Sequence, residues 1–347
     1  MTESSNTGKT ENATLKDTSK DVQAAPAKGT AWSNIHWSDY KSTLLPLVGL
    51  AALLIFFSIM SDNFLQVSTL YTIAREAAVV LVVSIGLTFV VLMGSIDLSV
   101  GATVTLAGLV AAKTAQEYEA GTALLAGVVA GVLVGVLNGL LFAYAKVPSF
   151  LATLGSSLAI GGLAQWYTSG RPVQIFDTSM LGISQGTLIG SIPNIAVWAV
   201  LIWIVMSLVG LNTRFGRYSY AIGGGEVVSR LAGIPVRRMK FYVMVMCSTL
   251  AAVAGILLAM RVGAATPTTE SNLTLNAIAA VVMGGTALTG GVGGVHRTIL
   301  GVLVITTLSV GLNALVVPPY LQLIIQGAVV VLAVAITLDR SRITILK

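Results

Sequence analysis

Long hydrophobic blocks separated by short polar turns make up the chain from residue 44 onward. Most blocks are about 17 to 25 residues long, the length of an α-helix that crosses a hydrocarbon layer roughly 30 Å thick. The ten-residue alternation of an outer-membrane β-barrel is not found in the sequence. The pattern predicts an all-α integral membrane protein with about ten transmembrane helices, near residues 44–60, 72–93, 98–115, 122–145, 149–166, 194–211, 241–260, 276–289, 298–316 and 320–338.

The first 43 residues have a different pattern. Ser, Thr, Lys, Asp and Ala predominate, and no charged segment followed by an apolar one indicates a cleaved export signal. Trp32, Trp37 and Tyr40 come just before the first span, where aromatic rings settle among lipid headgroups. We therefore expect a disordered cytoplasmic tail over 1–43 with an interfacial end, a membrane domain over 44–338 and a cytoplasmic C-terminus over 339–347.

The distribution of basic residues predicts the orientation. Short cytoplasmic loops of membrane proteins carry an excess of Lys and Arg. If both termini are cytoplasmic, 16 of the 20 basic residues lie on the inner side. Only Arg171 and Arg261 then lie in outer loops, while Arg75 and Lys113 lie within spans near their outer ends. Both termini are therefore predicted to be cytoplasmic.

Composition excludes several classes of function. The chain is 55% hydrophobic and 10% charged, with a mean hydropathy of +0.87, far from the averages of soluble domains. Its single cysteine, Cys247, cannot form a disulfide within the chain, and two histidines make metal or triad chemistry implausible. A G-x-x-x-x-G-K-[ST] phosphate loop is absent from the sequence. We predict no catalytic residue, no metal site and no ATP hydrolysis by this chain.

An aspartate lies in the stretch "MGSIDLSVGA", residues 93–102, at the predicted inner end of the second span. A glycine there can end one helix, and Asp97 or Ser99 can cap the first amides of the next. Alternatively, an ionisable group inside a helix bundle marks a gate or a pathway. Arg75 and Glu76 can offer the carboxyl a partner in principle, but the predicted topology places them toward the other face.

A second stretch, "MGGTALTGG" at 283–291, matches the first and also follows a valine-rich span. Transporters often contain broken helices in corresponding places of two repeats. The predicted topology, however, gives both preceding spans the same direction, whereas an inverted repeat would oppose them. The similarity is either a recurring turn or a sign that the span count is off by one. The helix-break or gate candidates are Asp97, Ser99, Gly101, Gly284 and Gly285.

Other polar residues on apolar spans are candidates for a solute path. A hydroxylated solute needs such hydroxyl and amide partners, but ordinary packing explains them equally, since polar residues often bond across membrane helices. These candidates are Asn138, Thr153, Ser156, Gln165 and Asn313.

The longest inner loop, about 212–240, contains a glycine run followed by a predicted short helix from Glu226 to Ala232. Gly233 and Pro235 end this helix, and Arg230 lies four residues after Glu226, a favourable ion-pair spacing. A short rigid helix at the inner face suits docking into another protein. A positively charged anchor loop is the alternative interpretation.

Four motifs in order make the sequence resemble the permease subunit of bacterial ABC sugar importers, the ribose, xylose and galactose permease family. The similarity runs from about Asn63 to Thr337. At Ser95, Gly162, Gly225 and Asn276 the chain departs from the residues usual in that family. The motifs are "GSIDLSVG" (94–101), "NGLLFAYAKVPSFLATLG" (138–155), "GRYSYAIGGGEVVSRLAGI" (216–234) and "LNAIAAVVMGGTALTGG" (275–291).

The resemblance implies a multi-pass protein of the bacterial inner membrane that works in an assembly. Two permeases, either two copies or a copy and a sibling, form the channel within the membrane lipid. A cytoplasmic ABC ATPase with two nucleotide-binding cassettes carries the ATP and magnesium, so no cofactor is expected on this chain, and no nucleic acid is a partner. A periplasmic sugar-binding protein delivers a monosaccharide or polyol.

In the resembled family, the loop helix inserts into a cleft of the ATPase. The matching coupling residues here are Gly223, Gly224, Glu226, Arg230, Leu231, Gly233 and Ile234. Two alternatives stay open: a permease for branched-chain amino acids or nucleosides, and a secondary carrier or channel that works without an ATPase.

Overall fold

The computed structural model describes residues 37–268 and 271–337. The predictions for residues 1–36 and for the C-terminus 339–347 lie outside the described residues. Contacts divide the chain into residues 1–39, of which only the start of the first helix is described, and residues 40–347. The fold below is that of the second unit.

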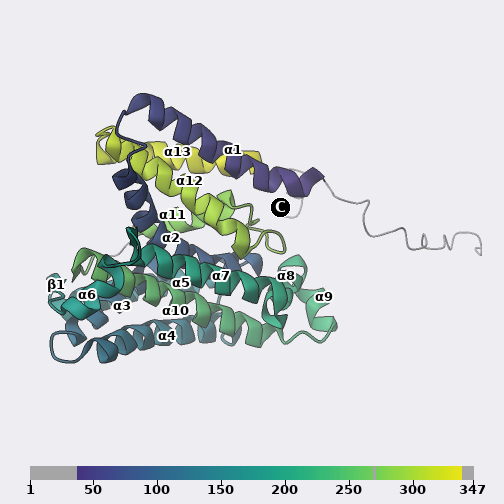
Figure 1. Ribbon diagram of the computed structural model, residues 1–347. Helices are drawn as coiled ribbons and strands as arrows, with labels where there is room; N and C mark the ends of the chain where they lie inside the picture. Colours follow the sequence, from purple (N-terminus) through teal and green to yellow (C-terminus); the bar gives the residue numbers. More distant parts are fainter. Residues whose placement is uncertain (1–36, 269–270, 338–347) are drawn as a thin grey trace, which may run out of the picture. The chain divides into compact units, whose positions relative to one another are not determined.

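The described residues are predominantly helical (Figure 1). The helices are α1 (Trp37–Met60), α2 (Val67–Leu92), α3 (Val100–Thr114), α4 (Ala120–Ala143), α5 (Ser149–Thr168), α6 (Thr178–Gln185), α7 (Asn194–Asn212), α8 (Arg214–Gly224), α9 (Glu226–Leu231), α10 (Val236–Val262), α11 (Ser271–Met283), α12 (Val295–Ala314) and α13 (Pro319–Thr337). Four short strands, β1 (Val173–Gln174), β2 (Thr187–Ile189), β3 (Ile192–Pro193) and β4 (Ala264–Ala265), form two antiparallel pairs, β1 with β4 and β2 with β3.

Ten of these helices overlap the ten predicted hydrophobic spans, and their ends differ from the predicted ends by up to seven residues. The largest difference is at α1, which begins at Trp37, inside the segment 1–43 predicted to be a disordered tail. Among the described residues, α2, α4, α7, α10 and α12 are long and apolar enough to cross a membrane by themselves. Shorter apolar stretches lie in α1, α3 and α11. The helical membrane-protein class is therefore confirmed, while the number of crossings stays a prediction.

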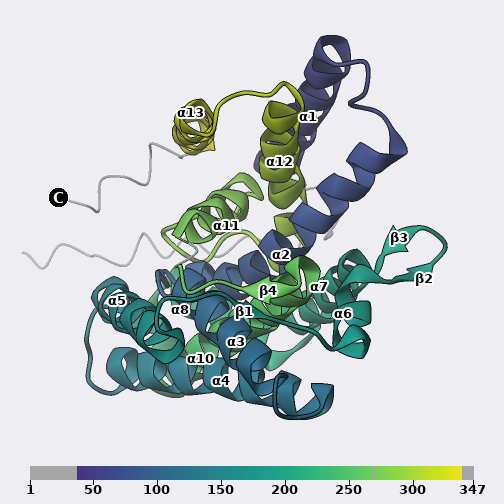
Figure 2. The same cartoon turned by 90° about the vertical axis from the view of Figure 1, so that its left-hand side faces the viewer.

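Helices α2 and α10 form the centre of the main core. Every residue of α2 from Ala77 to Leu92 is buried, because α10, α7, α11 and α12 surround it. A helix that is apolar on all sides is expected in such a position. Helix α10 packs against α4, α3 and α2 (Figure 2), and small residues such as Gly135 and Gly255 bring the α4 and α3 backbones close to it.

A second apolar cluster joins α1, the start of α2 and α12. Its members are Phe57, Phe64, Ile73, Leu308, Val310 and Leu312. Gly311 of α12 lies directly against the ring of Phe57, so a side chain there would overlap the ring.

Charged contacts mark the two ends of α10. Near its C-terminus, Arg261 pairs with Glu76 of α2 at 3.2 Å, and near its N-terminus Lys240 pairs with Glu226 at 2.7 Å. Arg261 and Glu76 were both predicted to lie toward the outer face, and Lys240 and Glu226 at the inner face. Residues that the sequence assigns to one face therefore meet in the structure.

Candidate functional site

The break between α2 and α3 begins with a helix cap built on Gly94. Gly94 has a φ of +69°, its amide donates to Val91 O, and the amide of Ser95 donates to Val90 O. This pair of bonds is the Schellman arrangement, which favours glycine because the residue must adopt a left-handed conformation. The prediction that a glycine of this motif ends the second span is thus confirmed.

Asp97 lies fully buried in the turn that follows, at 0% exposure. Its Oδ1 accepts the amide of Ser99 at 2.8 Å and the hydroxyl of Ser99 at 2.6 Å. Ser99 is the N-cap of α3, but its side chain caps no amide of that helix. The amide of Gly101, in the first turn, donates instead to Thr274 Oγ1 of α11 at 3.0 Å. The sequence offered Asp97 or Ser99 as the cap of α3. Asp97 accepts the backbone amide of the N-cap residue, whereas the Ser99 side chain accepts no backbone amide, because Thr274 of a neighbouring helix supplies the acceptor for Gly101.

Helix α5 satisfies two further amides of the break. Leu98 N donates to Thr153 Oγ1 at 3.0 Å, and Ile96 N donates to Ser149 Oγ at 3.2 Å. Exposed amides are costly in an apolar environment, so these hydroxyls allow an unwound segment inside the bundle. Ser149 and Thr274 were not singled out from the sequence, because an isolated hydroxyl on an apolar helix carries no signal of its partner.

The solute-path candidates separate into two groups. Asn138 Nδ2 donates to Ser99 Oγ at 2.8 Å. Thr153 Oγ1 accepts the amide of Leu98, and Ser156 Oγ donates to Thr153 O at 3.1 Å. These three residues therefore belong to the network around Asp97. Gln165 and Asn313 are exposed elsewhere in the fold, and Asn313 Oδ1 accepts a bond from Gln322.

Several buried polar atoms in this region have no hydrogen-bond partner among the described residues. They include Asp97 Oδ2, Asn138 Oδ1 and Ser248 Oγ. The Cys247 thiol lies beside the Asp97 carboxyl group, so the cysteine lies within the Asp97 network. The network draws on the α2–α3 turn, α4, α5, α10 and α11, so it connects five parts of the bundle through buried polar groups.

The second motif forms the same cap after α11. Gly285 has a φ of +84°, its amide donates to Val282 O, and the amide of Thr286 donates to Val281 O. Gly285 therefore corresponds to Gly94 in the structure. The sequence match had paired Gly94 with the preceding residue, Gly284. The loop that follows the second cap contacts the first cap, since Gly290 lies against Gly94, so α2 and α11 end on the same side, as the predicted topology requires. The shared feature is a recurring helix cap.

The inner loop contains two helices, of which one was predicted. The predicted helix is α9, and it ends in a third Schellman cap, with Gly233 at φ +80° and Ile234 N donating to Ser229 O. Helix α8 was missed because its glycines indicated a loop. Its N-cap, Thr213, accepts the amide of Gly216 at 3.4 Å and is the local signal that could have revealed it.

Glu226 holds α9 against α10. Its carboxylate accepts from Arg230 at 2.7 Å within α9 and from Lys240 of α10 at 2.7 Å. The hydrogen bond from Lys240, with both positive charges nearby, lowers the pKa of Glu226 below its ordinary value of 4.5, although partial burial opposes the shift. Val227, Val228 and Leu231 are 70%, 71% and 84% exposed, whereas Ser229 is buried. Helix α9 is thus fixed on one side and presents an apolar surface on the other.

The lowered pKa gives a testable pH dependence. A carboxyl with a lowered pKa stabilises the folded state above its unfolded pKa and loses this contribution as pH falls through the folded value. We expect the hydrogen-exchange rates of the α9 amides, corrected for intrinsic rates, to stay constant from pH 7 to about pH 5. The rates should rise once the pH falls below 4.5, the ordinary pKa of the Glu226 carboxyl. Glu226→Gln should remove this dependence. A rise already between pH 7 and pH 5 would contradict the assignment.

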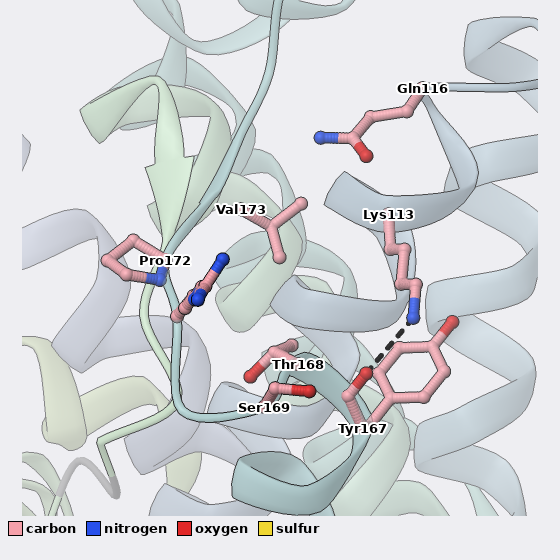
Figure 3. A pocket seen from close by; sticks show the side chains of 8 residues that line it. Lys113, Gln116, Tyr167, Thr168, Ser169, Pro172 and Val173 are labelled. Carbon is pink, nitrogen blue, oxygen red and sulfur yellow. Dashed lines mark hydrogen bonds between the residues drawn. The ribbon is translucent and has the colours of Figure 1, made fainter.

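A cavity of about 220 Å³ lies near the ends of α3 and α5 and contains none of the predicted site residues. Figure 3 shows Lys113 pointing toward Tyr167, where its ammonium donates to the Tyr167 carbonyl at 3.0 Å and lies 4.1 Å from the ring centroid. Lys113 was predicted to lie near the outer end of its span. This contact suits an amphipathic anchor at the membrane surface.

Comparison with known proteins assigns the chain to a class of transport protein. The family described as the branched-chain amino acid transport system / permease component matches residues 69–334, and the chain belongs to this family. It is therefore a transporter subunit and not an enzyme.

Curated relatives are similar over nearly their whole length. The ribose import permease protein RbsC of Bacillus subtilis (strain 168) is 39% identical over 318 residues, which cover 90% of this chain and 97% of that protein. RbsC of Escherichia coli (strain K12) is 36% identical, covering 84% and 92%. The xylose transport system permease protein XylH of Haemophilus influenzae is 31% identical, covering 85% and 96%. These relatives confirm the resemblance seen in the four motifs. No solved structure matches the chain.

Proposed function

We propose that this chain is the membrane-spanning permease of an ATP-driven importer that moves a monosaccharide or related polyol across a bacterial inner membrane. About ten spans with both termini in the cytoplasm account for the distribution of basic residues. Two permeases, a cytoplasmic ATPase with two cassettes and a periplasmic binding protein complete the assembly. The ribose and xylose permeases to which the chain is similar support a sugar as the solute.

The observation that carries the proposal is the position of α9. Glu226 fixes this helix to the end of α10 while Val227, Val228 and Leu231 stay exposed, and α8 packs against the end of α2. A short helix with an exposed apolar surface, held rigidly at one end of a helix bundle, can transmit movement of a bound ATPase as a rigid-body shift. ATP binding would then alternate the permeases between inward-open and outward-open states.

Reconstitution tests this function. We expect liposomes that contain the permease, its cognate ATPase and its binding protein to take up ribose or xylose only when ATP is present. Omission of any one protein should reduce uptake to background. Uptake by the permease alone would overturn the importer proposal. ATP-dependent uptake of leucine without uptake of sugar would instead favour the branched-chain amino acid function named in the family description.

A further inference from the structure

Three backbone segments meet at the end of α2 without intervening side chains. They are Leu92–Gly94 at the end of α2, Gly223–Gly224 at the end of α8, and 289–291 in the loop after α11. Gly291 N donates to Leu92 O at 2.9 Å. We call Gly94, Gly223, Gly290 and Gly291 the glycine junction.

The junction requires glycine because the backbones lie in direct contact. A Cβ added to Gly223 would overlap Leu92 O and Gly291 N. Gly290 has a φ of +86°, and a Cβ there would lie 2.7 Å from Gly94 N and 3.0 Å from Gly223 Cα. Only glycine allows so close an approach at these positions. By contrast, a Cβ on the adjacent Gly224 would have no other atom within 4 Å.

The junction connects α8 to both helix breaks. Gly94 is the cap residue that begins the α2–α3 break, three residues before Asp97, and Gly290 follows the cap after α11 by five residues. A side-chain bond adds a second connection, because Tyr220 Oη of α8 donates to Gly293 O at 2.8 Å. Since closely packed segments move together, a displacement of α8 must displace both breaks or break these contacts.

We propose that the glycine junction is a positioning element that carries movement of α8 and α9 to the two helix breaks. The inference rests on the proposed function and adds to it the route from the ATPase-facing loop to the buried Asp97 network. Gly94, Gly223, Gly290 and Tyr220 act through the segments that they hold and need not contact the solute.

A glycine outside the coupling loop provides the matched control. Gly223→Ala inserts a methyl group into the junction, whereas Gly162→Ala, within α5, adds the same group where no atom lies within 4 Å. Both substitutions replace a helical glycine with a better helix former. The added methyl group of Gly223→Ala points at Leu92 O and Gly291 N and not at the exposed surface of α9, so we expect both variants to bind the ATPase within about twofold of the wild-type affinity. In reconstituted liposomes, the number of ATP molecules hydrolysed per sugar imported should rise at least tenfold in Gly223→Ala and stay unchanged in Gly162→Ala.

The ratio of ATP to sugar separates coupling from folding, because a fraction of misfolded permease lowers uptake without changing the ratio among active complexes. A wild-type ratio in Gly223→Ala would overturn the proposal. If Gly223→Ala does not fold, Tyr220→Phe is the deciding variant, because it removes only the hydrogen bond to Gly293. A raised ratio of ATP to sugar in Tyr220→Phe would support the proposal, and an unchanged ratio would overturn it. Failure of the proposed function is distinguishable, because the wild-type permease would then bind no ATPase or import sugar unaided.

Discussion

Replacing Asp97 with Ala is expected to lower the free energy of unfolding by roughly 2–4 kcal/mol, because it leaves buried donors without an acceptor. The amide and the hydroxyl of Ser99 both donate to Asp97 Oδ1, and Asn138 in turn donates to the Ser99 hydroxyl. All three residues are fully buried, so water cannot replace the lost bonds without opening the break between α2 and α3. An SDS titration in mixed micelles would measure the change.

The chain offers a matched control for this experiment. Asp177, the N-cap of α6, accepts the amide of Ser179 at 2.8 Å and its hydroxyl at 2.6 Å, the same two bonds as at Asp97. Asp177 also accepts the amide of Met180 at 3.2 Å. The two bonds from Ser179 are exposed, so water can replace them and Asp177→Ala should destabilise the fold much less than Asp97→Ala. Asp97→Asn keeps the accepting oxygen and should also remain close to the wild type. Equal effects of Asp97→Ala and Asp177→Ala would show that burial of the Asp97 turn does not stabilise the fold.

The hydrophobic pattern predicted the helices well because apolar length is dictated by the bilayer. Each predicted span coincides with a helix, yet α3 contains only 15 residues, and its start depends on acceptors from α5 and α11. Such tertiary capping leaves no local pattern, so Ser149 and Thr274 could not be recognised. Helix α8 was missed for a related reason: its Gly216 and Gly223 are present for close backbone contact and not for a turn.

The coupling loop was predicted in part. The spacing of Glu226 and Arg230 predicts their ion pair, which the structure contains, but Lys240 lies 14 residues away and belongs to the next helix. Spacing rules describe pairs of residues on one helix and do not predict contacts with the next helix of the chain. For the same reason, the sequence predicted the same role for Gly223 and Gly224. In the structure, Gly223 contacts two other backbone segments, whereas Gly224 faces open space.

Replacing Leu231 with Asp is expected to weaken binding of the ATPase at least tenfold, the equivalent of about 1.4 kcal/mol. Leu231 is 84% exposed on α9, beside the exposed Val227 and Val228, so it makes little contribution to the fold. A buried apolar anchor commonly dominates the energy of a protein interface, and a carboxylate in its place must be desolvated. Titration of the purified ATPase against the permease in lipid nanodiscs would measure the affinity.

Leu188→Asp provides the control, because Leu188 is a 63% exposed leucine of β2. It follows α6, whose Gln185 donates to Met260 O near the C-terminus of α10, whereas α9 is held by Lys240 near the N-terminus of that helix. The two leucines therefore lie toward opposite ends of α10, and only Leu231 should affect ATPase affinity. An unchanged affinity in Leu231→Asp would exclude the apolar surface of α9 as the docking site. Equal losses in both variants would indicate a general effect of the added charge, since a specific interface must distinguish the two ends.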